Sequence, residues 1–195
     1  MPPASPLLRS KTAPPRAARR TLARPRLMRL LGEALEHTVT LLQAATGYGK
    51  STALAAFVAG DLPATWVWYT VSEDDAEPAR FLAYLIEALR LRLPEFPAGP
   101  AARLAEAAQL GEGWTRVVDA LANALDECGR DVLLIIDDYH FAADAPAVQR
   151  LLDRLLASLP SRAHLLIATR VPLTSSVLPG LRARGEVLEL GVDAL

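Results

Sequence analysis

One nine-residue segment limits the possible folds of this chain more than any other part of its sequence. It reads Ala-Ala-Thr-Gly-Tyr-Gly-Lys-Ser-Thr from residue 44 to residue 52. Its end matches the pattern G-x-x-x-x-G-K-[ST], in which backbone N–H groups surround phosphates, the lysine contacts β- and γ-oxygens and the hydroxyl binds Mg²⁺. The pattern predicts a nucleotide-binding loop formed by Ala45, Thr46, Gly47, Tyr48, Gly49, Lys50, Ser51 and Thr52, with Ser51 also a ligand of Mg²⁺.

The residues on either side decide whether this segment is such a loop, because Ala44 occupies the place of the first glycine. The run from Thr38 to Leu42 is apolar and β-branched, as expected of a short strand. The run from Thr52 to Ala59 has the composition of a helix. A strand, a loop and a helix therefore follow one another in the order that phosphate-binding loops require. An ordinary structural turn is the alternative explanation.

Lysine is rare in this chain, which has two lysines, Lys11 and Lys50, against nineteen arginines. One of the two occupies the lysine position of the pattern. A compact ammonium group on a thin stem fits inside a phosphate-binding loop, whereas a planar guanidinium does not. The lysine at position 50 therefore agrees with a role in phosphate binding.

Strand-like and helix-like segments alternate along the rest of the chain. Apolar and β-branched runs predict strands at residues 65–71, 132–136, 164–170 and 186–190. Helical spacing of apolar residues, in part after prolines, predicts helices from Pro78 and over residues 101–110, 114–128 and 145–159. This alternation predicts an α/β fold with a parallel sheet flanked by helices, which together with the loop indicates a P-loop NTPase.

Three polar side chains follow buried strands at the carboxyl edge of the predicted sheet, where ligands bind in such folds. Asp137 ends the run 132–136 and is predicted to bind Mg²⁺ together with Ser51. Asp138 is the predicted catalytic residue that orients or deprotonates a water, with capping of the next turn as the alternative. Arg170 is the predicted second catalytic residue, which stabilises charge on the γ-phosphate; an ordinary surface arginine is the alternative.

The composition indicates one domain without a membrane-spanning segment. Apolar residues make up 51% of the 195 positions, enough for a substantial core. The best candidate span, Ala53 to Val71, is interrupted by Gly60-Asp61-Leu62-Pro63, and the N-terminus lacks the apolar segment of a secretory signal. A lone cysteine, Cys128, excludes an intrachain disulfide and fits a reducing compartment. We therefore expect a cytoplasmic protein that does not contact a membrane.

Positive charge is concentrated at the N-terminus. Residues 1–36 contain eight basic and two acidic residues, a balance of +6, although the whole chain carries −1. No aromatic residue lies among them to stack on bases, so a solvated tail is favoured over a nucleic-acid arm. Pro25 is suited to the first position of a helix. We expect a basic, Pro- and Arg-rich entry segment at 1–24 and a P-loop NTPase domain at 25–195.

Other patterns of catalysis or metal binding are weak. The three histidines, His37, His140 and His164, are far apart and lack partners at metal-ligand spacing, so a zinc site is not expected. Asn123 and Asp126 lack the lysine of a guanine-reading box, and adenine is the expected base. The expected cofactors are ATP or ADP with Mg²⁺.

Taken together, these segments resemble the NTPase module of MalT-type regulators of the LuxR family, a branch of the STAND P-loop ATPases. The resemblance covers nearly the whole chain, and alanine at position 44 is normal in that family. Arg24 lies in one of the matching segments and is expected to contribute to the nucleotide site. The matching segments are Leu7 to Lys11 with Pro14-Pro15, Leu22 to Leu27, Ala45 to Thr52, Trp68 to Asp75, Pro78 with Arg80-Phe81, Tyr84 to Ile86, Ile135 to His140, Ala168 to Arg170 and Leu181 to Leu190.

The resemblance implies the strand order 2-3-4-1-5 and a signalling switch that is closed with ADP and activated by ATP and an inducer, with slow ATP hydrolysis. In the family a winged-helix segment, helical sensor repeats and a helix-turn-helix follow this module, and we expect them to be absent from these residues. The expected partners are the nucleotide, an inducer or sensor domains outside this chain, and an ATP-dependent oligomer of the full regulator. Sequence-specific DNA binding by this segment alone is not expected.

Two other functions agree with the same loop. A small-molecule P-loop kinase would need an acceptor pocket and a mobile lid that carries an arginine, and the segment 171–179 has none. A nucleotide-binding remnant without catalysis is the second alternative.

Overall fold

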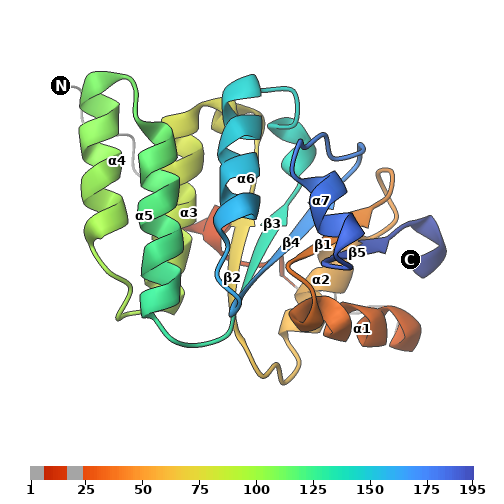
Figure 1. The fold of residues 1–195 in the computed structure, drawn as a ribbon. Helices are drawn as coiled ribbons and strands as arrows, with labels where there is room; N and C mark the ends of the chain where they lie inside the picture. Colours follow the sequence, from red (N-terminus) through yellow and green to blue (C-terminus); the bar gives the residue numbers. More distant parts are fainter. Residues whose placement is uncertain (1–6, 17–23) are drawn as a thin grey trace.

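A five-stranded parallel sheet forms the centre of the molecule (Figure 1). The computed structural model describes residues 7–16 and 24–195, so much of the predicted entry segment 1–24 lies outside the described residues. The strands are β1 (Val39–Gln43), β2 (Thr65–Thr70), β3 (Val132–Asp137), β4 (Ala163–Thr169) and β5 (Val187–Leu190). Their order is β2-β3-β4-β1-β5, and all neighbours are parallel. The predicted α/β P-loop fold and the strand order 2-3-4-1-5 are confirmed.

Helices cover both faces of this sheet (Figure 1). One face is covered by α1 (Pro25–Gly32) and α2 (Lys50–Val58). The other is covered by α3 (Pro78–Arg92), α5 (Trp114–Glu127), α6 (Pro146–Ser158) and α7 (Leu178–Ala183), and α4 (Gly99–Leu110) packs outside against α3 and α5. The short 3-10 helices are η1 (Arg9–Thr12), η2 (Glu33–Glu36), η3 (Glu73–Ala76), η4 (Tyr139–Phe141) and η5 (Val192–Ala194). In the described part of the chain, no helix combines the length and apolar character needed to cross a membrane.

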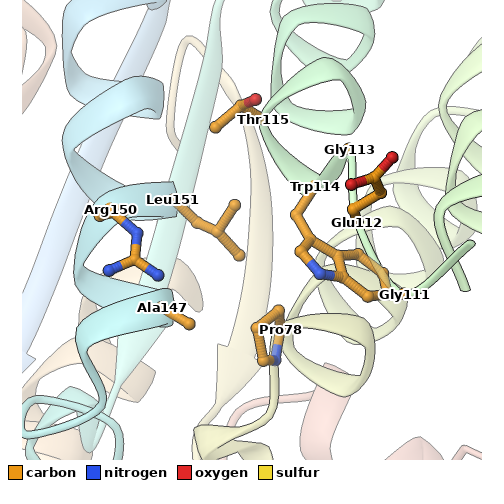
Figure 2. A pocket seen from close by; sticks show the side chains of 9 residues that line it. All are labelled: Pro78, Gly111, Glu112, Gly113, Trp114, Thr115, Ala147, Arg150 and Leu151. Atoms are coloured by element: carbon orange, nitrogen blue, oxygen red, sulfur yellow. The ribbon is translucent and has the colours of Figure 1, made fainter.

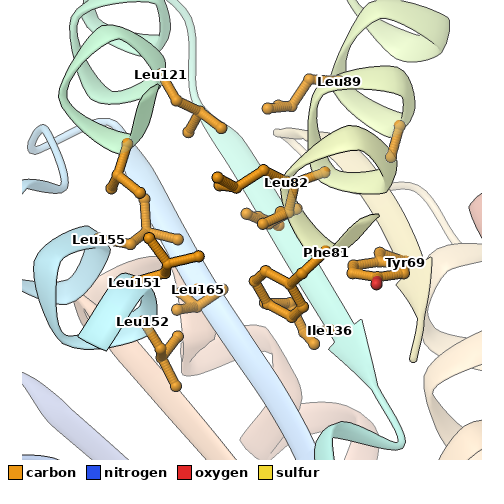
Figure 3. Close-up of a cluster of buried hydrophobic side chains, with 14 of the residues drawn as sticks. Tyr69, Phe81, Leu82, Leu89, Leu121, Ile136, Leu151, Leu152, Leu155 and Leu165 are labelled. Carbon is orange, nitrogen blue, oxygen red and sulfur yellow. The ribbon is translucent and has the colours of Figure 1, made fainter. Parts of the chain in front are cut away.

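The central strand β3 shows how the sequence places a core on each side of the sheet. Side chains alternate between the faces of a strand, and those of Leu134 and Ile136 join the cluster under α3, α5 and α6. Leu133 and Ile135 join the cluster under α1 and α2. Figure 3 shows the first cluster, in which leucines of α3, α5 and α6 lie around β3. Each fully buried side chain of this size contributes about 1.5–3 kcal/mol to the free energy of folding. Burial on both faces therefore stabilises the sheet between its two layers of helices.

The sequence pattern predicted no helix between β4 and β5, where the structure has α7. Proline and serine are frequent just before this helix, Pro179 lies inside it, and it is only six residues long. Its leucines Leu178 and Leu181 are both buried in the core. Packing of these two side chains, rather than helix propensity, therefore explains why the segment is helical.

Candidate functional site

The loop between β1 and α2 lies at the carboxyl edge of the sheet, where it is tied to the neighbouring strand. The N–H of Ala44 donates to the carbonyl oxygen of Thr169, the last residue of β4, over 3.3 Å. Gly47 and Gly49 have φ values of 87° and 76°, a region that glycine adopts without a side-chain penalty. Ala44 does not have a positive φ, since Asp138 is the single non-glycine residue with one in the described chain. An alanine in place of the first glycine is therefore compatible with this loop.

Lys50 begins α2 and points back under the loop. The residue is buried, with 6% of its surface exposed, and its Nζ donates to the carbonyl oxygens of Ala44 (2.6 Å) and Ala45 (3.2 Å). Burial lowers the pKa of Lys50, an effect that Asp138 opposes. An ammonium group carries three N–H donors, and these two bonds use two of them. The side chain is thus held at the loop with one donor remaining for a phosphate oxygen.

Arg24 lies against the same loop. Its Nη1 donates to the carbonyl oxygen of Tyr48 over 2.9 Å. A Cβ atom added to Gly49 would approach Nη2 of Arg24 to 3.3 Å. The guanidinium therefore packs closely on the loop backbone, and a Cβ at position 49 would displace it by a few tenths of an ångström.

Asp137 and Ser51, the two residues predicted to bind Mg²⁺, lie beside each other. Asp137 ends β3 and is buried, with 2% of its surface exposed. Burial raises the pKa of Asp137 to about 6, and a hydrogen bond from the Ser51 side chain acts in the opposite direction. Mg²⁺ is commonly bound by one or two carboxylates completed by phosphate oxygens and water. A buried carboxylate beside a hydroxyl fits that chemistry.

The protein alone supplies few further ligands for a metal. Across residues 7–16 and 24–195, no group of three or more His, Cys, Asp or Glu side chains is arranged to hold a metal ion. A cation bound by Ser51 and Asp137 would therefore need oxygen atoms from the nucleotide or from water to complete its shell.

Asp138 turns out of β3 in a left-handed conformation with φ 55°. Such a conformation costs a non-glycine residue about 1–2 kcal/mol. Although Asp138 occupies the N-cap position of η4, its side chain makes no capping hydrogen bond. Its Oδ1 instead lies 4.0 Å from Nη2 of Arg170 and 3.8 Å from Nδ1 of His140. These contacts place the side chain beside two groups of the site, and the geometry does not support capping of the next turn.

His140 also lies in the site, although the sequence pattern did not predict a role for it there. Both ring nitrogens are buried without a hydrogen-bond partner in the described structure. Its ring lies 4.3 Å from that of Phe141, measured between centroids. Burial lowers the pKa of His140, with Arg170 adding to the effect, so the imidazole is neutral near pH 7. One feature of the sequence could have indicated this residue. His140 lies two residues after Asp138, in the segment from Ile135 to His140 that resembles the MalT-type family.

Arg170 directly follows β4, the strand that lies between β3 and β1. Its guanidinium is partly exposed and lies 5.7 Å from the centre of the Phe141 ring. The structure thus brings Lys50, Asp137, Asp138 and Arg170 to one edge of the sheet, as the strand ends predicted.

A separate hollow of about 340 Å³ lies between the start of α3, the turn before α5, and α6. Figure 2 shows Trp114 and Arg150 among the side chains that line it. None of its lining residues belongs to the loop 44–52 or to η4. The chemistry expected of a nucleotide site, a buried lysine with a buried carboxylate, is found at the loop and not in this hollow.

The chain is similar to curated transcriptional regulators over nearly all of its length. HTH-type transcriptional regulator MalT of Yersinia pestis strain Pestoides F is 29% identical over 192 residues, and that of Serratia proteamaculans strain 568 is 29% identical over 194 residues. Each match covers 97% of this chain and 20% of the relative. The chain therefore spans about a fifth of the length of these regulators.

Solved structures share the fold at low sequence identity. The Walker-type ATPase PABY2304 of Pyrococcus abyssi has a TM-score of 0.58 at 16% identity, covering 92% of this chain and 55% of its own. Cdc6p from Pyrobaculum aerophilum has a TM-score of 0.56 at 17% identity, covering 91% of this chain and 48% of its own. At these identities the likeness shows the fold alone.

A family model described as an AAA domain matches residues 34–174, which is more than half of the chain. Together with the similarity to the MalT regulators, this match confirms the resemblance to a MalT-type NTPase module. The chain belongs to the AAA domain family.

Proposed function

We propose that this chain is the regulatory module of a MalT-type transcriptional regulator, which binds ATP or ADP with Mg²⁺ and hydrolyses ATP slowly. The observation that supports this most strongly is the meeting of three segments at one edge of the sheet. The loop after β1 supplies Lys50, the end of β3 supplies Asp137 and Asp138, and the end of β4 supplies Arg170.

Each of these residues has a proposed role in the site. The loop residues from Ala45 to Thr52 and Arg24 bind the nucleotide, and the Lys50 ammonium contacts its β- and γ-phosphates. Ser51 and Asp137 hold Mg²⁺, which when bound neutralises charge on the phosphate oxygens. Arg170 stabilises the charge of the γ-phosphate as its bond to the leaving oxygen breaks.

Asp138 is the proposed group that orients the attacking water and accepts a proton from it. The guanidinium of Arg170 lies 4.0 Å from Oδ1 of Asp138, at ion-pair distance, and so holds this carboxylate at the site. The neutral imidazole of His140, 3.8 Å from the same oxygen, is a positioning group for Asp138 and for the turn that carries it. Hydrolysis then yields ADP and phosphate in a site whose protein groups are already in place.

In the proposed switch, nucleotide state changes the population of two conformations. An inducer or sensor domains outside this chain and an ATP-dependent oligomer of the whole regulator are its proposed partners. We do not propose sequence-specific DNA recognition by these residues. The small-molecule kinase is less well supported, because α7 buries Leu178 and Leu181 in the core and is not a free lid over the site.

An assay with ATP and Mg²⁺ as the only substrates tests this function. The purified chain is incubated with ATP under single-turnover conditions, and nucleotides are then released by denaturation and separated. We expect slow phosphate release and ADP retained on the protein. A kinase would release little phosphate until an acceptor is added, and a remnant without catalysis would hold ATP unchanged. Either of these two results would contradict the proposed hydrolysis.

A further inference from the structure

The other lysine of the chain, Lys11, lies in a buried ion cluster far from the nucleotide loop in sequence. It belongs to residues 8–12, named here the strap, which lie beside the edge strand β2 and α3. The Nζ of Lys11 donates to Oδ2 of Asp75 and to Oγ of Ser72, both at 2.5 Å. The strap is therefore joined to the start of η3 through its side chain.

Asp75 is the acceptor at the centre of this cluster, and it has no exposed surface. Its Oδ1 accepts a bond from Nε of Arg80 at 3.0 Å, and its Oδ2 accepts one from the N–H of Ser72 at 2.9 Å. A buried carboxylate is tolerated only when it is paired and hydrogen-bonded. Lys11 is one of the two cations that pair with it, so docking of the strap and the conformation of η3 depend on each other.

Further contacts show that the strap is docked along its length. The N–H of Leu8 donates to the hydroxyl of Tyr84 over 3.2 Å. The Lys11 ammonium lies 4.6 Å from the centre of the Tyr84 ring, within the range of a cation–π interaction. Tyr84 itself is buried and stacks on Tyr69 of β2. The strap thus rests on core residues of β2 and α3.

The segment held by Lys11 adjoins the turn at residues 138–141, which carries Asp138 and His140. Between β2 and η3, the N–H of Val71 donates to the carbonyl oxygen of Asp137 over 2.9 Å. The helices η3 and η4 pack against each other. Phe141 of η4 lines one hollow of about 300 Å³ together with Ser72, Glu73 and Asp74. The Phe141 ring also contacts His140, as described above. The helix η3 therefore packs against the turn 138–141.

We propose that Lys11 is a positioning residue: by clamping the strap to Asp75 it fixes η3, and η3 in turn fixes the turn that carries Asp138 and His140. In the proposed function the nucleotide phosphates contact the loop after β1, and β1 is separated from β3 by β4. Loss of the clamp is therefore expected to slow ATP turnover while leaving nucleotide affinity nearly unchanged. The expected effect on turnover rests on the proposed function, whereas the expected loosening of η3 and of the turn 138–141 does not.

Hydrogen exchange of Lys11→Met tests the clamp without reference to activity. We expect amide exchange to become at least about tenfold faster in residues 71–76 and 138–142, with α5 unchanged as an internal reference. Arg9→Met is the matched control in the same strap, because Arg9 is exposed, and it should change neither segment. Faster exchange in 71–76 alone, or equal acceleration in α5, would overturn the positioning role.

Turnover and ADP affinity of the same variants form the second measurement. Lys11→Met should lower single-turnover hydrolysis by about tenfold with ADP affinity within about twofold of the wild type. An unchanged rate, or equal losses in rate and affinity, would overturn the proposal. If the wild type hydrolyses no ATP, the proposed function fails and the exchange result still decides the clamp.

A charge-preserving variant covers the case in which Lys11→Met does not fold. Lys11→Arg keeps the charge but replaces a compact ammonium by a planar guanidinium. It should speed exchange in both segments by a smaller factor, and unchanged exchange in residues 138–142 would overturn the positioning role.

Discussion

The carboxylate of Asp138 and the guanidinium of Arg170 lie 4.0 Å apart although 32 positions separate them in the chain. Parallel pairing of β3 with β4 brings them together, because each residue directly follows its strand. His140 approaches the same carboxylate oxygen from η4. A negative, a positive and a neutral group therefore meet where the proposed mechanism requires a water and the γ-phosphate.

Substitution of Asp138 should separate hydrolysis from binding. Asp138→Asn removes the proton acceptor, and loss of a general base typically lowers a rate by about 10²–10⁴-fold. We expect ATP affinity within about threefold of the wild type, since Lys50 and the loop are unchanged. Single-turnover hydrolysis and calorimetry measure the two quantities, with the exposed Asp144→Asn as control. An unchanged rate in Asp138→Asn would exclude its proposed role.

Substitution of His140 should have a similar but smaller effect. The imidazole has no hydrogen-bond partner in the described residues and touches Asp138 and Phe141. His140→Ala should lower hydrolysis by about tenfold or more and leave ADP affinity nearly unchanged, because it acts through Asp138. His37→Ala is a suitable control, since His37 contacts the backbone of Glu33 instead. Equal rates for the two variants would show that His140 has no positioning role.

Asp137 should make the stability of the nucleotide-free protein depend on pH. Burial raises the pKa of Asp137 to about 6, so its ionised form opposes folding at higher pH. The wild type should therefore gain stability relative to Asp137→Asn as pH falls from 7 through 6 towards 4, by up to about 3 kcal/mol. Thermal melts of both proteins without nucleotide or Mg²⁺ measure this difference. If the difference in stability between the two proteins stays constant over that pH range, burial does not disfavour the ionised form of Asp137.

Gly49 should be required for more than its backbone conformation. Gly49→Ala and Gly111→Ala both place an alanine at positive φ, which costs about 1–2 kcal/mol. At Gly49 alone the new Cβ would also meet the Arg24 guanidinium at 3.3 Å, whereas nothing lies within 4 Å at Gly111. Both variants should lose stability, and only Gly49→Ala should also lose ADP affinity, by about tenfold or more. Equal ADP affinities of the two variants would argue against a contribution of this loop to the site.

Much of this architecture could be predicted because its signals are local. The periodicity of β3 and of the flanking helices predicted the sheet, and the residues that end each strand predicted that Asp137, Asp138 and Arg170 lie at its carboxyl edge. The contact between Lys11 and Asp75 joins residues 64 positions apart and leaves no periodic pattern. The helix α7 is stabilised by two buried leucines within a segment rich in turn residues. His140 was missed because its role depends on the left-handed turn at Asp138, a conformation that local propensity does not predict.

Calorimetric titration of the wild type and of Lys50→Ala with ADP and Mg²⁺ measures nucleotide binding at the loop between β1 and α2. Lys50 is the buried cation of the loop, and a charge-assisted contact to phosphate contributes about 1.5–3 kcal/mol. We expect binding by the wild type and an affinity about ten- to a hundredfold weaker for Lys50→Ala, with a melting curve that shows the variant is folded. Equal affinities of the two proteins, or no binding by the folded wild type, would contradict nucleotide binding at this loop.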